Sequence, residues 1–450
     1  MKKLVSLALS AAVGITAAAS LASCSKEKPV VGLICLHGDN STYDKNFIEA
    51  FKSAAKAKGL SDDQIAIVVN IPEGNECYDA AKDLVDQGCK AIFADSFGHE
   101  KFLLKAAREF PEVQFCHATG TTAHTEKLDN FHNAFASIYE GRYLAGVAGG
   151  LKLKEKIEND ELTAENYDSG KKGEGNVVIG YVGAYTYAEV ISGYTSYYLG
   201  VKSVVENIVM DVTFTGSWYD ETAEKSAANM LATAKSDKAD EKKSGKAALI
   251  SQHADSLGAP TACETNGIPN VSYNGSTQSA GPNTFIVSSR INWQPYYELM
   301  IDAAQNPDDE SKKIPADWCG TLDTGSVELS DLGSVAAKGT QEKLNAVKAE
   351  LMSGKLKVFD TSKFTVTKRE AGTNGKDDTG LNVNATVFDG ILTQYKADVD
   401  TDAAYTADTE VVEEATIDGK TVRYFAESKF RSAPYFDIQI DGINLLNAKF

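Results

Sequence analysis

The chain has 450 residues, and its 63 acidic residues outnumber its 45 lysines and arginines to give a formal net charge of −18. A chain with this excess of negative charge is repelled by phosphate backbones, and because the sequence has no basic stripe we exclude nucleic acid as a partner. The length exceeds the roughly 100–200 residues of one typical domain, so we expect two domains.

The N-terminus has the pattern of an export signal. Two lysines precede an apolar, alanine-rich run over residues 4–19, which is short for a membrane span and ends in small residues. The run leads to Leu21-Ala22-Ser23-Cys24, which resembles the lipobox of bacterial lipoproteins. We therefore expect residues 1–23 to be a signal peptide, Cys24 to carry a lipid and residues 24–29 to form a tether. The alternative is an ordinary secretory signal with an incidental cysteine.

Apolar runs and helical periodicities alternate through the next 120 or so residues. They predict strands at residues 30–36, 65–71, 90–94 and 113–117, and helices at residues 47–58, 79–87, 99–110 and 138–151. The strands are short and almost wholly apolar, which is typical of strands covered on both faces. This rhythm predicts a parallel, doubly wound sheet.

Residues 155–176 are polar and glycine-rich, and we expect a surface insertion or a crossover there. The rhythm then starts again. It predicts strands at residues 177–182, 209–214, 247–251, 271–273 and 285–288, and helices at residues 189–205, 220–234 and 296–304. The chain therefore contains a second doubly wound unit of similar size.

The remaining segment has a mixed pattern. It predicts a helix at residues 340–353 and strands at residues 357–359, 421–425 and 435–440. We expect an α/β protein with the type I periplasmic-binding-protein fold: two doubly wound parallel-sheet lobes, a hinge and a strand-rich C-terminal extension. The expected boundaries are 30–150 for the N-terminal lobe, 176–320 for the C-terminal lobe, 321–360 for the crossover and final helix, and 361–450 for an extension packed on one lobe.

The loops after the predicted strands contain the candidate ligand-binding residues, because ligands of open α/β sheets bind outside the carboxyl ends of the strands. Most of these loops combine an aromatic ring, which can stack on a flat ligand, with Asp, Asn or Ser, which can hydrogen-bond to it. The candidates are Tyr43, Asp44, Phe47, Asp95, Ser96, His117, Tyr185, Trp218, Asp220, Asp255, Asn274 and Trp293. Helix capping is the alternative role for a single Asp or Ser, and core packing is the alternative for Trp218 and Trp293.

Several motifs resemble one known family. The most specific is Tyr139-Glu-Gly-Arg-Tyr-Leu-Ala-Gly146, and Asp44-Lys-Asn-Phe47, Gly216-Ser-Trp-Tyr-Asp220, Gln252-His-Ala-Asp-Ser256 and residues 350–359 add to it. Together they resemble the basic membrane protein family of substrate-binding lipoproteins, which includes purine nucleoside receptors. The resemblance covers roughly 330 residues.

This resemblance implies the type I periplasmic-binding fold and delivery of a nucleoside to an ABC importer. It implies that Phe47 stacks on a purine and that Asp95 lies near the ribose, with Asp255 and Trp293 as further contacts. The chain departs from the family pattern at Asn46, Ile48 and His117. A free nucleobase such as adenine, or another small neutral solute, is therefore an alternative ligand.

The sequence has no GxSxG, HExxH or P-loop motif and no clustered metal ligands, so we expect no catalytic residue, cofactor or metal. A nucleoside-processing enzyme on the same scaffold, and a surface adhesin or sensory component, are the alternative functions. The expected partners are a small-molecule ligand, an ABC permease and, through the lipid, the outer face of a membrane; we expect a monomer. The sequence does not decide whether Cys77 pairs with Cys89 or Cys263 with Cys319.

Overall fold

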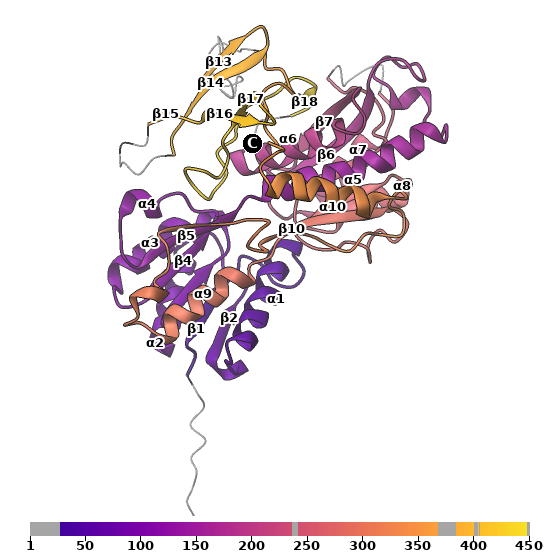
Figure 1. Cartoon of the computed structure of the whole chain (residues 1–450). Coiled ribbons are helices and arrows are strands. Elements are labelled where there is room, and N and C mark those ends of the chain that lie inside the picture. Colours follow the sequence, from indigo (N-terminus) through magenta and orange to yellow (C-terminus); the bar gives the residue numbers. More distant parts are fainter. Residues whose placement is uncertain (1–27, 236–241, 368–383, 400–403, 405, 448–450) are drawn as a thin grey trace, which may run out of the picture.

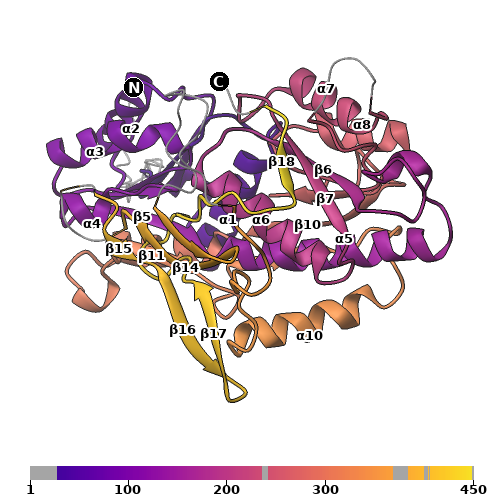
Figure 2. The ribbon, with the colours of Figure 1, turned by 90° about the horizontal axis from the view of Figure 1, so that it is seen from above.

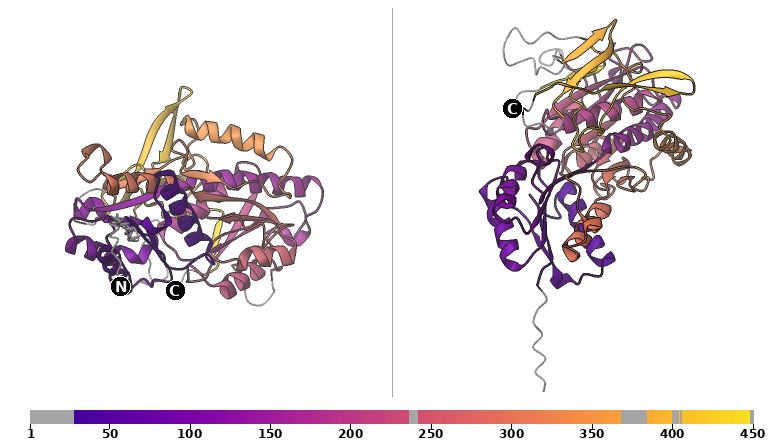
Figure 3. Two further views of the ribbon diagram at one scale, coloured as in Figure 1. Left: turned by 90° about the horizontal axis from the view of Figure 1, so that it is seen from below. Right: turned by 60° about the vertical axis from the view of Figure 1, so that its left-hand side comes forward.

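The structure is a computed structural model, and it describes residues 28–235, 242–367, 384–399, 404 and 406–447. The chain forms two α/β lobes, with the C-terminal strands on the outside of them (Figure 1). The two further views in Figure 3 show the lobes as distinct bodies. The predicted pair of doubly wound lobes with a strand-rich C-terminal region is confirmed.

The first lobe is built on a six-stranded sheet with the order β11-β5-β4-β3-β1-β2. All neighbouring strands in it are parallel. The strands are β1 (Val31–Ile34), β2 (Ile65–Val68), β3 (Ala91–Ala94), β4 (Gln114–Ala118), β5 (Phe131–Ala136) and β11 (Asp317–Gly320). The helices are α1 (Thr42–Ala57), α2 (Asn75–Gln87), α3 (Glu100–Glu109), α4 (Ala123–Glu126) and α9 (Gln294–Gln305). Short 3-10 turns lie at Asp62–Gln64, Phe97–His99 and Glu310–Lys312.

Alternate side chains of these strands enter two separate cores. Phe93 on β3 packs with α1 and α9, whereas its neighbour Ile92 packs with α2 and α3 on the opposite face. This alternation is the period of two that a strand imposes, and it explains why almost every strand residue is apolar.

The second lobe repeats this arrangement in a seven-stranded sheet with the order β12-β10-β9-β8-β6-β7-β18. Its strands are β6 (Val177–Gly183), β7 (Ile208–Phe214), β8 (Ile250–His253), β9 (Asn270–Tyr273), β10 (Phe285–Ile291), β12 (Val327–Leu329) and β18 (Ile443–Leu445). Only the edge strand β12 runs antiparallel to its neighbour. The helices are α5 (Ile138–Glu158), α6 (Ala188–Lys202), α7 (Glu221–Leu231), α8 (Gly258–Asn266) and α10 (Thr340–Met352), and a 3-10 turn lies at Ala164–Asn166.

Helices α5 and α6 touch through glycines. A Cβ on Gly146 would meet the carbonyl oxygen of Tyr197, and a Cβ on Gly200 would meet that of Tyr143. The two backbones can lie this close only because neither position has a side chain. The small residues of the predicted helix at 138–151 therefore serve helix packing in the second lobe.

Three segments cross between the lobes: β5 to α5, β10 to α9, and β11 to β12. Hydrogen bonds tie the crossings to one another, from the Ser137 N–H to the Gly320 carbonyl at 2.8 Å and from the Asn292 N–H to the Ser326 carbonyl at 2.7 Å. The Asn46 side chain also donates to the Ile291 carbonyl at 2.7 Å. A compact hinge of this kind lets two rigid lobes rotate.

The C-terminal extension contains β13 (Ala385–Phe388), β14 (Ile391–Ala397), β15 (Thr409–Glu410), β16 (Val412–Ile417) and β17 (Lys420–Phe425), and it ends with β18 in the second sheet (Figure 2). It also contacts the first lobe, because the Ser432 N–H donates to the Asp317 carboxylate on β11 at 2.7 Å. The extension therefore contacts both lobes rather than packing on one.

The lobe boundaries differ from those expected. The expected N-terminal lobe, 30–150, includes the start of α5, but α5 packs on α6 in the second lobe. The expected C-terminal lobe, 176–320, includes α9 and β11, but β11 pairs with β5 and α9 packs on α1 (Figure 1). The chain returns to the first sheet late in the sequence, and such a return leaves no local signal.

Some local predictions were also wrong. Residues 357–359 and 435–440 are irregular rather than strands, although Phe359, Phe436 and Ile438 are buried. Their apolar side chains pack into the core without forming a ladder. Strand β5 and helix α8 were missed, and α5 extends to Glu158, into the predicted insertion.

Cys24 and the expected signal peptide lie outside the described residues, as does most of the tether. Within the part of the chain that the structure describes, no helix is long and apolar enough to cross a membrane. The six described cysteines are all free thiols.

We expect Gly146→Ala to lower the free energy of unfolding by about 1–3 kcal/mol, because the added methyl group would overlap the backbone of α6. Urea denaturation followed by circular dichroism measures this change. Gly275→Ala is the control, since its methyl group would meet only Thr42 at 3.9 Å. An unchanged unfolding midpoint for Gly146→Ala would contradict the close contact between α5 and α6.

Candidate functional site

A pocket lies between the lobes where the strand order of each sheet reverses. In the first sheet this switch point is between β1 and β3, and in the second it is between β6 and β8. Ligands of doubly wound sheets bind at such points. The lining residues are Leu36, His37, Tyr43, Asp44, Ser96, Phe97, Thr119, Glu189, Trp218, His253 and Asp255, and they surround about 380 Å³, including the part open to solvent.

The pocket is narrow because the lobes touch around it. Thr42, in the first turn of α1, donates from its N–H at 2.9 Å and from its hydroxyl at 3.1 Å to the carbonyl of Asp255 in the second lobe. The Phe97 ring of the first lobe stacks on Tyr187 of the second, with centroids 5.3 Å apart. These contacts define a closed arrangement of the lobes.

Aromatic rings of the second lobe pack together behind the Trp218 side of the pocket. Tyr187 stacks on Tyr185 at 5.2 Å, and Tyr185 makes an edge contact with Trp218 at 5.0 Å. Trp218 is only partly buried and lines the pocket, so one part of its ring is available to a ligand. A flat, partly apolar molecule is the type of ligand that such a ring can bind.

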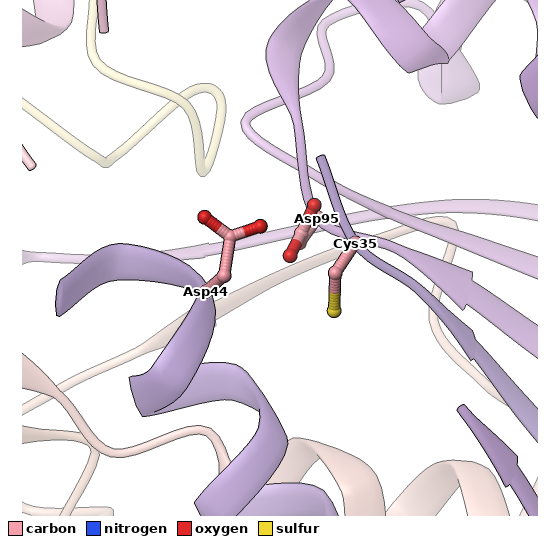
Figure 4. A group of neighbouring side chains, drawn as sticks. All are labelled: Cys35, Asp44 and Asp95. Atoms are coloured by element: carbon pink, nitrogen blue, oxygen red, sulfur yellow. The ribbon is translucent and has the colours of Figure 1, made fainter. Parts of the chain in front are cut away.

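Beneath the pocket lies the group Cys35, Asp44 and Asp95 (Figure 4). Their ligand atoms all lie within 4.8 Å of one another, and all three residues are buried. One thiol and two carboxylates could in principle hold a divalent cation. However, burial and then the nearby Asp95 raise the pKa of the Cys35 thiol well above its usual range, so the thiol is protonated.

The two carboxyl groups of this trio differ in charge. Burial works to raise the pKa of Asp44, but hydrogen bonds from His37 and Ser41 outweigh burial and lower it. Burial and then the charge of Asp44 raise the pKa of Asp95 well above its usual range. Asp44 is therefore the ionised partner and Asp95 the protonated one, which is how two adjacent buried carboxyls avoid repulsion.

A further buried acid faces them from the second lobe. Asp255 accepts a hydrogen bond from the Asn274 side chain at 3.1 Å. Burial, followed by the charge of Asp44, raises the pKa of Asp255 well above its usual range. The pocket thus contains an ionised and a protonated carboxyl, which can accept and donate hydrogen bonds.

Glu189 and His253 form the remaining polar pair. The Glu189 carboxylate lies 3.4 Å from Nε2 of His253, and both side chains are largely buried. Glu189 lies in the first turn of α6, directly after the β6 loop, and His253 is the last residue of β8. Both positions belong to the switch point of the second sheet.

The structure brings five of the twelve candidates to the pocket wall and leaves seven away from it. The five are Tyr43, Asp44, Ser96, Trp218 and Asp255. Three further candidates contact the wall residues from behind. The Asp95 carboxyl accepts a hydrogen bond from the Leu36 N–H, and the Asn274 side chain donates one to Asp255. The Tyr185 ring packs on the edge of Trp218.

The other four candidates have structural roles. Phe47 and Trp293 are fully buried and stack on each other with centroids 4.5 Å apart, so neither face of this pair is open to a ligand. His117 is buried, with Nε2 at 2.7 Å from the Ser96 carbonyl. Asp220 is exposed and caps α7, because its side chain accepts from the Ala223 N–H.

Sequence reasoning missed six wall residues: Leu36, His37, Phe97, Thr119, Glu189 and His253. Five of them lie in the loops after β1, β3, β4 and β6 or in the helical turn that follows, and His253 is the last residue of β8. The signal that could have found them is their position at the switch points. The stacking role that the family resemblance implied for Phe47, and the ligand contact it implied for Trp293, do not fit two rings that are buried against each other.

Two doubly wound lobes, three hinge crossings and an aromatic, acidic pocket at the facing switch points define a solute-binding protein of the periplasmic-binding type. The family model described as ABC transporter substrate-binding protein, PnrA-like, matches residues 39–362. The chain belongs to this family, as the motifs of the sequence predict. Members of the family bind a small-molecule ligand outside the cytoplasm and supply it to an ABC permease.

Individual relatives agree with this result. A purine-binding protein of Brucella abortus is 28% identical over 369 residues, which cover 80% of this chain and 92% of the relative. A putative ABC transporter glucose-binding protein of Haloferax volcanii is 25% identical over 273 residues, 61% of this chain and 60% of the relative. An ABC transporter solute-binding protein of Conexibacter woesei has the same fold, with a TM-score of 0.54 at 18% identity, over 73% of this chain and 98% of that one.

We expect the free energy of unfolding to fall as the pH rises above about 4, because the buried Asp95 is protonated in the folded state. Because the pKa of Asp95 is higher in the folded state than in the unfolded state, the protonated carboxyl stabilises the fold fully below the ordinary Asp pKa. This stabilisation is lost as the pH rises through the pKa that Asp95 has in the folded state. Asp95→Asn should therefore show a shallower decline between about pH 4 and 8 in urea denaturation. Asp39→Asn, an exposed carboxyl nearby, is the control. Identical slopes for Asp95→Asn and the wild type would contradict the protonated state.

We expect Phe47→Ala to lower the free energy of unfolding by about 3–5 kcal/mol, because the substitution leaves a cavity between α1 and Trp293. Thermal and urea denaturation measure the loss. Phe388→Ala, at a ring that is 70% exposed, should change stability by less than about 0.5 kcal/mol. A Phe47→Ala variant as stable as the wild type would show that this ring is not part of the core.

Proposed function

We propose that this protein captures an uncharged purine, as the free base or the nucleoside, in the pocket between the lobes. The observation that supports this most is the position of Trp218 and the carboxyl groups of both lobes around one pocket. The Brucella abortus relative, named as a purine-binding protein, supports the same ligand class. The ring would lie against Trp218, and its N–H groups or the ribose hydroxyls would donate to carboxylates.

The charge of the pocket favours a ligand without phosphate. Asp44, Glu189 and Asp255 are acidic, and none of the described wall residues is Lys or Arg. A phosphate group would lie among these acids without a positive partner, which is costly in a site of low dielectric. Donor groups on an uncharged ligand would instead find acceptors on both lobes.

A sugar is the second candidate ligand. The Haloferax volcanii relative is named as a putative glucose-binding protein. Trp218 and neighbouring carboxylates could also bind a pyranose, because the apolar face of a sugar packs on aromatic rings and its hydroxyls donate to acids.

Ligand binding would be coupled to lobe closure. The Thr42–Asp255 and Phe97–Tyr187 contacts hold the lobes together beside the pocket. A ligand that touches both lobes stabilises the closed state alone, and it therefore shifts the equilibrium between open and closed molecules toward the closed state. The closed protein would then be the form that the permease recognises.

We also propose that the protein is held at the membrane by a lipid on Cys24, as the lipobox-like sequence indicates. A tether of this kind keeps a receptor near its transporter and raises its effective concentration there. Mass spectrometry of the mature N-terminus should find a diacylglyceryl-modified Cys24, and Cys24→Ala should release the protein from membranes. Intact Cys24 in a released, unmodified protein would contradict the anchor.

We expect Trp218→Ala to weaken binding of adenine or inosine by at least about tenfold, or about 1.4 kcal/mol, since the ring loses its stacking partner. Isothermal titration calorimetry with adenine, inosine, inosine monophosphate and glucose measures the affinities. Phe388→Ala is the matched control, because this exposed aromatic residue lies in the extension. We expect no binding of the monophosphate.

Two results would contradict the proposal. Tight binding of glucose without binding of either purine would favour the sugar receptor. Release of free hypoxanthine from inosine during the incubation would favour the enzyme alternative.

A further inference from the structure

Arg142 is a buried cation behind the pocket. It lies on α5, within the motif that most resembles the family, and is 1% exposed. Arginine keeps its positive charge in proteins. Among the described residues, however, no carboxylate lies within ion-pair distance of the Arg142 guanidinium. A buried and unpaired charge is costly, so a role for it is expected.

The contacts that Arg142 does make are uncharged. Its Nη2 donates to the Tyr181 hydroxyl and, at 3.1 Å, to the Gln252 carbonyl. The guanidinium lies over the Tyr273 ring, 4.5 Å from the centroid, which partly compensates for lost hydration. Its Nε and Nη1 atoms are buried without a hydrogen-bond partner.

Arg142 and His253 lie next to each other. The His253 ring packs on the same Tyr273 ring, with centroids 4.7 Å apart. A Cβ on Gly193 would lie 3.0 Å from Nδ1 of His253 and 3.7 Å from Nε of Arg142, so both nitrogens face the space that this glycine leaves. Like Nε of Arg142, Nδ1 of His253 has no hydrogen-bond partner.

We propose that Arg142 is a positioning residue that keeps His253 uncharged, and that this preserves the negative charge with which the Glu189 carboxylate accepts hydrogen bonds from the ligand. A protonated His253 would form an ion pair with Glu189, 3.4 Å away, and would neutralise an acceptor of the pocket wall. The unpaired charge of Arg142 opposes that protonation. This role rests on the proposed function of the pocket.

The groups around His253 are consistent with this role. Glu189 faces it from α6, Arg142 from α5 and Tyr273 from β9, while the Trp218 ring lies 6.4 Å away and Asp255 follows two residues later. Burial lowers the pKa of His253, the contact with Glu189 works in the opposite direction, and the charge of Arg142 lowers it further. Arg142 is therefore the charged neighbour that offsets Glu189.

The test compares the protonation of His253 in the wild type, Arg142→Met and Arg142→Lys, followed by NMR in the full chain. His253→Gln identifies the signal. In the wild type we expect the pKa of His253 to lie below the ordinary histidine value of about 6.5, because burial and the charge of Arg142 disfavour its protonation. In Arg142→Met its pKa should rise by about one unit, whereas Arg142→Lys should return it toward the wild type.

Calorimetry with inosine provides the second readout. Between pH 7.5 and 5.5 the affinity of Arg142→Met should fall several-fold more than that of the wild type, and the double variant Arg142→Met/His253→Gln should lose this added pH dependence. A wild-type His253 that titrates near its ordinary pKa, or an Arg142→Met variant with an unchanged His253 pKa, would overturn the role of Arg142. If neither the wild type nor any variant binds inosine or adenine, the proposed ligand is wrong, but the NMR titration still decides the role of Arg142. If Arg142→Met does not fold, Arg142→Gln, which removes the charge but keeps a hydrogen-bond donor, takes its place in the titration with the same expected rise of the His253 pKa.

Discussion

Closure of the two lobes gathers buried carboxyl groups from both sheets around one small pocket, and the rest of the site depends on how that negative charge is tolerated. Asp44 comes from α1 and Asp255 from the loop after β8, and the contact of Thr42 with the Asp255 carbonyl holds the two loops together. Hydrogen bonds keep Asp44 ionised, while burial and the charge of Asp44 keep Asp95 and Asp255 protonated. The pocket therefore presents acceptors and donors side by side, which suits an uncharged polar ring and opposes an anion.

The two lobes repeat the same doubly wound sheet, and each contributes one switch point to the pocket. Each sheet reverses its strand order between its first and third strands, and residues at both reversal points line the same pocket between the lobes. The glycine contacts of α5 and α6 bring the backbones of these helices together, and the same helices supply Arg142 and Glu189 to the rear and the wall of the pocket. The C-terminal extension adds a contact to the first lobe at Asp317 and a strand, β18, to the second sheet. Opening the lobes must therefore accommodate this extension as well as the three crossings.

Much of the fold could be predicted from the sequence because its signals are local. The apolar runs at β1, β3, β4, β6 and β7 and the helical periods between them give the two doubly wound units. What could not be predicted depends on contacts between distant segments: the return of β11 to the first sheet, and β18 at the edge of the second. The site was also predicted only in part. The position of the loops after the strands identified Asp44, Trp218 and Asp255 as pocket residues. Residue type could not distinguish a ligand-stacking ring from the buried Phe47–Trp293 pair. Glu189 and His253 become recognisable only when the two switch points are seen to face each other.

The most direct test of this account is a crystal structure of the full mature protein grown with adenine or inosine. The account predicts closed lobes, a purine ring packed against Trp218, and ligand donors within hydrogen-bond distance of Asp44 and Glu189. A purine bound outside this pocket, or one held in it without contact to Trp218 or to either carboxylate, would contradict the account.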